Sequence, residues 1–81
     1  MTKKHFEMIA KVLNRRAKAI EFANAKDREK LFAVLELRKT MYNFADEFEL
    51  VNSNFNRDTF FKACDIQPLL ELLTEYIHEI D

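Results

Sequence analysis

Apolar residues near the start of the chain recur at steps of three and four, the spacing that places side chains on one face of an α-helix. Thr2 is a suitable N-cap, so this helix is expected to begin at Lys3. Its apolar stripe consists of Phe6, Ile9, Leu13, Ala17 and Ile20. Phe22 falls on the opposite arc. We therefore expect the helix to break before Ala23 and to turn Phe22 inward; the alternative is an exposed Phe22 that makes a contact.

The pattern over residues 27–51 predicts a second, longer helix whose apolar positions cover about 200° of the helical wheel. These positions are Leu31, Val34, Leu35, Leu37, Met41, Tyr42, Phe44, Ala45, Phe48 and Val51. An ordinary surface helix needs a stripe about half as wide, so this helix must be covered on two sides. It is expected to be the central helix of a small bundle, a dimerisation helix, or both. Asn24 and Asp27 are the candidate caps at its start.

A polar segment, residues 52–56, ends the second helix, because Asn and Ser side chains form local hydrogen bonds that compete with those of a helix. Asn56 is suited to cap a short helix that ends near Cys64, where Asp65 stops it. A last helix, with Pro68 in its first turn, is expected to run almost to the end of the chain. Its apolar half comprises Leu69, Leu70, Leu72, Leu73, Tyr76, Ile77 and Ile80, and its polar half comprises Glu71, Thr74, Glu75, His78 and Glu79.

The chain has 81 residues, 48% of them apolar and 33% charged, which suffices for one small domain and not for two. It has no glycine, which tight β-hairpins and phosphate-binding loops usually need. The predicted fold is an all-α bundle of three main helices and one short helix, a single domain over residues 1–81. No apolar run reaches the ~20 residues that span a bilayer, and no secretory signal is seen, so a cytoplasmic protein is expected.

Charge is distributed unevenly, although the formal net charge is only −1. Residues 1–18 hold six Lys or Arg and one Glu, a net of +5, whereas residues 65–81 hold five Asp or Glu and no Lys or Arg, a net of −5. The two ends are expected to attract each other, within one molecule or between copies. On the polar arc of the first helix the cations alternate with two apolar residues. We call this line the basic ridge: Lys4, Met8, Lys11, Arg15, Lys18 and Phe22.

Two patterns of chemical interest involve the histidines. Glu75 and His78 have the Glu-x-x-His spacing of di-iron bundles, with Glu71 one turn earlier, but all three fall on the polar half of their helix. Cys64, the single cysteine, lacks a partner, because neither His5 nor His78 has the neighbouring pattern of a catalytic dyad. The preferred interpretations are a buried, reduced Cys64 and a solvated acidic face. No catalytic, metal-binding or cofactor-binding residue is assigned, and no cofactor is expected.

Two surfaces remain as candidates for binding. A protein interface is predicted on the wide arc of the second helix and the acidic half of the last: Arg38, Met41, Phe44, Phe48, Glu71 and Glu75. Arg38 lies inside the apolar arc, where either its stem packs while its guanidinium reaches water, or it forms an ion pair at a helix interface. The alternative is nucleic-acid binding by the cations of the basic ridge, which match a line of phosphates: Lys4, Lys11, Arg15 and Lys18.

Two segments of the chain carry a recognisable pattern. The first covers residues 2–13, which open with Thr-Lys-Lys-His-Phe-Glu-Met-Ile-Ala and include Leu13. The second covers residues 44–64 and includes Phe44-Ala45, Phe48, Asn52, Asn54-Phe55-Asn56-Arg57, Phe60 and Ala63-Cys64. This pattern resembles a family of short proteins of bacteriophages and prophages. That family opens with Thr-Lys-Lys, an aromatic residue and Ile-Ala, and carries an Asn-Pro-x-Phe-x-x-x-x-Phe-x-x-Ala-Cys-Gly segment. Here Ser53 takes the place of the Pro and Asp65 that of the Gly. The resemblance implies a phage or mobile-element origin and a bacterial cytoplasm, and brings no activity or functional residues.

The expected function is that of a small non-enzymatic protein-interaction module, and with the resemblance that of a phage accessory factor acting on a host protein. Its expected partner is a protein, which includes a second copy in a homodimer, and not a membrane. A nucleic-acid-binding protein that uses the first helix is the alternative. An enzyme is not expected.

Overall fold

Four helices account for most of the chain. The computed structural model describes residues 3–80, with side chains through residue 76. The helices are α1 (Lys3–Glu21), α2 (Asp27–Val51), α3 (Arg57–Cys64) and α4 (Gln67–Ile80). The predicted all-α bundle of three main helices and one short helix is confirmed. Thr2, the predicted N-cap of α1, lies outside the described residues. No helix within residues 3–80 is long and apolar enough to cross a membrane.

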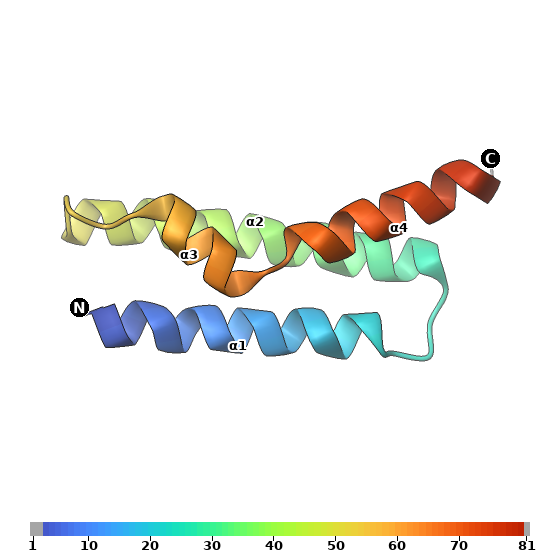
Figure 1. The fold of residues 1–81 in the computed structure, drawn as a ribbon, viewed down its shortest axis with the longest axis horizontal. Helices are drawn as coiled ribbons and strands as arrows, with labels where there is room; N and C mark the ends of the chain where they lie inside the picture. The colour runs from blue at the N-terminus through green and yellow to red at the C-terminus, as the bar shows by residue number, and fades with distance from the viewer. Residues whose placement is uncertain (1–2, 81) are drawn as a thin grey trace.

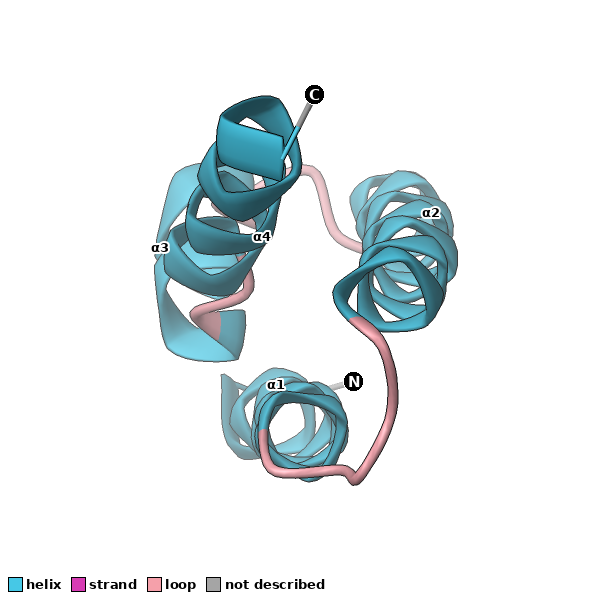
Figure 2. Cartoon of the chain, turned by 90° about the vertical axis from the view of Figure 1, so that its right-hand side faces the viewer, coloured by secondary structure: helices cyan, strands magenta, loops and turns pink. Residues whose placement is uncertain are grey.

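The helices pack as three arms (Figure 1). α1 and α2 run antiparallel beside each other, and α3 and α4 return along α2 as a third, bent arm. The view along the bundle shows the three arms around a common centre (Figure 2). α1 packs against α2 and α3, whereas α4 packs against α2 and turns away from α1 toward its C-terminal end. The wide apolar arc of α2 is therefore covered from two sides, as its sequence predicts, except at Tyr42 and Val51, which are 37% and 65% exposed.

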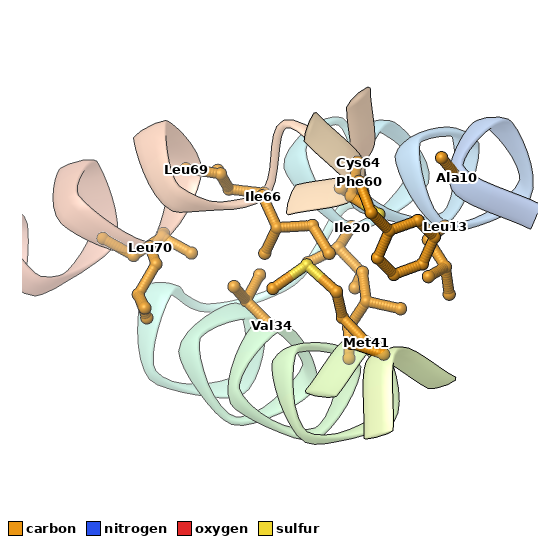
Figure 3. Packing of buried hydrophobic residues seen from close by; sticks show 14 of the residues in the cluster. Ala10, Leu13, Ile20, Val34, Met41, Phe60, Cys64, Ile66, Leu69 and Leu70 are labelled. Carbon is orange, nitrogen blue, oxygen red and sulfur yellow. The ribbon is translucent and has the colours of Figure 1, made fainter. Parts of the chain in front are cut away.

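One cluster of buried apolar side chains joins the three arms (Figure 3). Its members are Ala10, Leu13, Ala17 and Ile20 of α1, Val34, Leu37, Met41, Ala45 and Phe48 of α2, Phe60 and Cys64 of α3, the linking Ile66, and Leu69, Leu70 and Leu73 of α4. The predicted stripe of α1 is confirmed, with Phe6 and Ile9 half-buried at its edge. No polar or charged side chain is buried in the described part of the chain, so the core is held by apolar burial and shape.

Phe48 is the centre of an aromatic cluster at the end of the bundle where α1 begins. Its ring centroid lies 4.7 Å from that of Phe6, 5.3 Å from Phe55, 5.4 Å from Phe60 and 5.7 Å from Phe44. The rings come from α1, α2, α3 and the loop before α3, so a single side chain of α2 connects every segment at this end. Aromatic pairs at such distances contribute about 0.5–1.5 kcal/mol beyond their buried area.

The end of α1 confirms one expectation and corrects another. The helix ends at Glu21, before Ala23 as predicted, and the Lys30 Nζ caps it by donating to the Glu21 carbonyl oxygen at 2.9 Å. Phe22 was expected to turn inward, and this is wrong: its side chain is 79% exposed. The Phe22 amide still donates to the Lys18 carbonyl oxygen at 3.1 Å, so Phe22 keeps the helical direction and stays on the polar arc.

The second helix spans the predicted residues but begins without a side-chain cap. Its N-cap is Lys26, which forms no side-chain cap hydrogen bond, and Asp27, a candidate cap, is instead the first helical residue. A carboxylate in the first turn still favours the helix because the free amides there carry partial positive charge. At the other end the Asn52 amide donates to the Phe48 carbonyl oxygen at 2.9 Å.

The bend in the third arm is built by Asp65. Asn56 caps α3 as predicted, its Oδ1 accepting from the Thr59 amide at 3.0 Å. α3 then ends at Asp65, whose φ of 52° places it in the left-handed region. Asn14 of α1 ties the same end, because its Nδ2 donates to the Cys64 carbonyl oxygen at 3.0 Å. Glycine is the residue that takes such a positive φ without strain.

The two faces of α4 are less cleanly separated than its sequence predicts. Glu71 and Glu75 are exposed as expected, and the buried residues are all apolar. Leu72 and Tyr76 belong to the apolar half, yet they are 36% and 42% exposed. Leu72 lines a recess of about 160 Å³ with residues of α1, and α4 diverges from α1 farther along (Figure 1). The predicted positions of Ile77, His78, Glu79 and Ile80 concern side chains outside the described ones.

The aromatic cluster makes Phe48 the most sensitive position at its end of the bundle. Phe48→Ala is expected to lower the free energy of unfolding by about 3–5 kcal/mol, because it empties the centre of five packed rings. Leu50→Ala is the control: Leu50 lies two residues away on the same helix and is 80% exposed, so its truncation should change stability by less than about 0.5 kcal/mol. Urea unfolding followed by circular dichroism measures both. Equal effects would contradict the assignment of Phe48 to the core.

Asp65 gives a second test of the fold. A left-handed residue other than glycine costs about 1–2 kcal/mol, and glycine gains about 0.5–1 kcal/mol of chain entropy on unfolding, so Asp65→Gly should stabilise the protein by up to about 1 kcal/mol. Asp65→Ala is the matched variant, since alanine keeps the Cβ atom and should not stabilise. The melting temperatures of the two variants decide the matter. A less stable glycine variant would show that the Asp65 side chain itself holds the bend.

Candidate functional site

A groove opens where α1 begins, between that helix, the loop before α3, and α3. Its volume is about 340 Å³, which lies at the lower end of the range for ligand pockets. The floor is aromatic: the ring of Phe55 packs against those of Phe6 and Phe60, and all three line the groove. The remaining lining residues are Lys3, Glu7, Ala10, Asn52, Asn54, Asn56, Thr59 and Ala63. The groove is thus an apolar recess with a polar rim.

The side chains of Asn52 and Asn56 fix the loop that forms one wall of the groove. The Asn52 Oδ1 accepts from the Asn54 amide at 3.0 Å, and the Asn56 Oδ1 accepts from the Thr59 amide at 3.0 Å. The Phe55 amide also donates to the Asn52 carbonyl oxygen at 3.0 Å, so main-chain and side-chain hydrogen bonds together shape the loop. Phe55 lies between the two asparagines, with its ring 4.9 Å from that of Phe6. The loop is therefore held to α1 by aromatic packing and shaped by its own side chains.

The rim of the groove offers hydrogen bonds to a ligand. Asn52 and Asn56 use their oxygen atoms within the loop, which leaves both Nδ2 groups as donors. The side-chain amide of Asn54 forms no hydrogen bond with the described residues and offers both a donor and an acceptor. A peptide group presents the complementary donor and acceptor. The arrangement suits a ligand that combines an apolar side chain with exposed peptide groups.

The basic ridge lies on the side of α1 that faces away from the core, as predicted. All of its residues are exposed: Lys4, Met8, Lys11, Arg15, Lys18 and Phe22. Its four cations form no ion pair with any side chain of residues 3–76. They are consequently available to an anionic partner. Among the side chains through residue 76, no ion pair joins α4 to α1, and α4 packs on α2.

The predicted protein interface is divided by the structure. Met41 and Phe48 belong to the core, so their assignment to an interface is wrong: the third arm and α1 already cover the part of the arc on which they lie. Phe44 is half-buried against Phe48. Glu71 and Glu75 are exposed on α4, away from the aromatic groove.

Arg38, the remaining predicted interface residue, is half-buried and packs along its own helix. Its Nη2 donates to the Tyr42 hydroxyl at 3.2 Å, and its Cζ lies 5.2 Å from the centre of the Tyr42 ring. No described carboxylate pairs with it, so the hypothesis of an interface ion pair is not met within this molecule. The Arg38 Nε is buried and has no hydrogen-bond partner.

Arg57 holds α3 against the outer side of α2. Its Nη1 lies 2.8 Å from the Asp46 Oδ1 and 3.2 Å from the Glu49 Oε2, and its Cζ lies 5.5 Å from the centre of the Phe61 ring. The hydrogen bond to Asp46, with that to Glu49, raises the pKa of Arg57. Phe61 in turn contacts Tyr42 at 5.0 Å between ring centroids. These contacts position α3, the helix that forms one wall of the groove.

Cys64 is unsuited to nucleophilic chemistry in the folded protein. Its side chain is fully buried, and burial raises the pKa of the thiol from 9.0 to about 11. The proton is therefore retained near neutral pH, in line with the prediction of a buried, reduced cysteine. Among the side chains described, no group of His, Cys, Asp and Glu is arranged to hold a metal ion. The side chain of His78, part of the Glu-x-x-His spacing, lies outside those described.

Comparison of the chain with protein-family models, with curated proteins and with solved structures finds no match. The groove is thus assigned from its own geometry. Sequence reasoning placed Asn52, Asn54 and Asn56 in a loop and Phe6 in a core stripe without bringing them together. One signal in the sequence could have indicated the groove. Phe55 precedes the start of the short helix and Phe60 follows it, next to the asparagine-rich segment 52–56.

The buried thiol predicts how stability depends on pH. The thiol of the unfolded chain ionises near its ordinary pKa of 9.0 and that of the native protein near 11, so native stability should fall as pH rises from about 9 to about 11. Cys64→Ala lacks this ionisation, although it is less stable at neutral pH because it leaves a small cavity. The difference in urea midpoint between the two proteins should therefore shrink as pH rises. A difference that is independent of pH would contradict the raised pKa.

Proposed function

We propose that this chain is a small non-enzymatic protein-interaction module, and that its aromatic groove binds a peptide segment of a partner protein. The observation that carries the proposal is the combination of three phenylalanine rings beneath a rim of three asparagine amides. The bound segment inserts an apolar side chain between the rings, and its flanking peptide groups pair with the amides. Binding without catalysis is proposed because the single thiol of the chain is buried and protonated.

The size of the groove supports a side chain rather than a larger ligand. A volume of about 340 Å³ accommodates one large apolar side chain with its adjoining peptide groups. Lys3 and Glu7 stand together on the α1 rim of the groove and carry opposite charges. We therefore propose that recognition depends on the apolar side chain and on the peptide groups, with little selection for ligand charge.

The resemblance to bacteriophage and prophage proteins extends this proposal. The chain would be a phage accessory factor that acts on a protein of its bacterial host, in the host cytoplasm. Both segments that carry the resemblance contribute to the groove: Phe6 and Ala10 come from the first, and Phe55, Phe60 and Ala63 come from the second. Because residues of both segments line one groove, the shared pattern supports a role for these residues in forming it.

Selection of random peptides displayed on ribosomes, with the purified protein as bait, tests the proposal. Enriched peptides are expected to share one large apolar residue. Ala63→Trp fills the groove from an exposed position on α3 and should weaken their binding at least about tenfold, which corresponds to about 1.4 kcal/mol. The matched control is Lys62→Trp, which introduces the same side chain at the neighbouring exposed position, outside the groove.

Two results would overturn the proposal. One is the absence of enriched peptides from a library in which a known peptide-binding domain succeeds. The other is equal binding of the enriched peptides to Ala63→Trp and to Lys62→Trp, with both variants folded by circular dichroism. Chemical-shift changes at the amides of Asn54 and Phe55 on addition of a selected peptide would place it in the groove.

A further inference from the structure

We propose that the protein associates with a second copy of itself through two surfaces outside the groove: the basic ridge of one molecule and the exposed acidic side of α4 of the other. The inference is independent of the peptide-binding function. It starts from exposed charged side chains on α1 and α4 that form no ion pair with a described side chain. Lys11 and Arg15 on α1 form no ion pair with a described side chain, and neither do Glu71 and Glu75 on α4. The nearest polar partner of Glu71 is the neutral Gln67, whose Nε2 donates to it at 3.2 Å.

The spacing of the charges matches between the two helices. Lys11 and Arg15 are four residues apart, as are Glu71 and Glu75, and four residues correspond to a rise of about 6 Å along an α-helix. Two such helices laid side by side therefore bring both pairs of opposite charges together at once. Lys18 extends the cationic line by one further turn. A match at two successive turns fixes the register as well as the attraction.

An exposed apolar strip lies beside each line of charges. Met8 and Val12, 62% and 53% exposed, flank the cations of α1, and Leu72 and Tyr76, 36% and 42% exposed, flank the acids of α4. The members of each apolar pair are again four residues apart. The uncovered side of α4 arises where that helix turns away from α1 (Figure 1). Leu72 also lines a small recess with Ala17 and Lys18 of its own α1, so a second copy would add apolar cover to its exposed part and to Tyr76.

The order of the strips selects an antiparallel arrangement. At about 100° per residue, Met8 lies about 60° around α1 from Lys11, and Leu72 lies about 100° around α4 from Glu71, in the same rotational sense. When two such helices pack antiparallel, the charged strip of one lies opposite the charged strip of the other, and the two apolar strips also lie opposite each other. Charge then meets charge and apolar meets apolar. A parallel pair would place each apolar strip against the charges of the other helix.

A second copy fits the ridge better than a nucleic acid does. Phosphates would neutralise the cations but would leave Met8 and Val12 without apolar partners, whereas α4 of another molecule supplies both kinds of contact. Because exposed ion pairs are individually weak and are screened by salt, the association is expected to be reversible and strongest at low ionic strength. The copies form closed dimers or extend into chains according to the symmetry of the contact.

Charge reversal with rescue tests the inference by analytical ultracentrifugation at about 20 mM and about 500 mM salt. Wild-type protein should associate at low salt, with a dissociation constant that rises at least about tenfold at high salt. One variant carries Lys11→Glu with Arg15→Glu, and the other carries Glu71→Lys with Glu75→Lys. Each should remain monomeric alone, because both of its surfaces then have the same sign. An equimolar mixture should regain association, because acidic α1 then meets basic α4.

The control carries Lys26→Glu with Lys62→Glu, two exposed cations outside the ridge, and changes the net charge equally. It should associate as the wild type does. Circular dichroism confirms that every variant is folded. A wild type that is monomeric at millimolar concentration and low salt overturns the inference, as does a mixture that fails to associate. Association that disappears after nuclease treatment also overturns it and assigns the ridge to nucleic acid.

Discussion

The breadth of the apolar arc of α2 is the constraint on which the rest of the structure depends. An arc about twice as wide as that of a surface helix cannot be covered by a single neighbour, so the chain must return to α2 twice. α1 covers one side and the α3–α4 arm covers the other. The same demand explains why the core contains residues from every helix and why no described polar side chain is buried within it. Met41 and Phe48, central in this arc, are buried in the core and are not accessible to a partner.

The bent third arm determines which surfaces remain open. Asp65 ends α3 in the left-handed region and redirects the chain, so α3 lies on α1 whereas α4 follows α2. The start of α4 and the second half of α1 line a small recess, and the divergence beyond it leaves Leu72 and Tyr76 partly exposed. At the opposite end α3 is held close to α1 and forms the wall of the groove. This one backbone turn therefore has two results. It places α3 beside the groove at one end of the bundle, and at the other end it leaves Glu71 and Glu75 of α4 exposed.

Helical periodicity predicted the elements of this fold well, because each helix has a local signal. The span of α2, the cap at Asn56 and the proline in the first turn of α4 all depend on neighbouring residues. The inward turn of Phe22 failed because one more main-chain hydrogen bond carried the helical direction past Glu21. The interface residues Met41 and Phe48 failed because the wheel of one helix does not show which part of its arc the other arms will cover. The groove combines residues separated by about half the chain, and no local pattern brings them together.

The construction of the groove links binding to the completion of folding. α3 has eight residues, too few to persist alone in water, and its C-terminal end is tied to α1 by the hydrogen bond from Asn14 to the Cys64 carbonyl oxygen. The wall that α3 provides therefore exists only once α1 and α2 have paired and α3 has docked on them. A ligand of the groove would bind the native state alone, and its binding would shift the folding equilibrium toward that state. The partner would thus act on this chain as a folding cofactor does, raising its resistance to unfolding and proteolysis in proportion to the logarithm of the partner concentration.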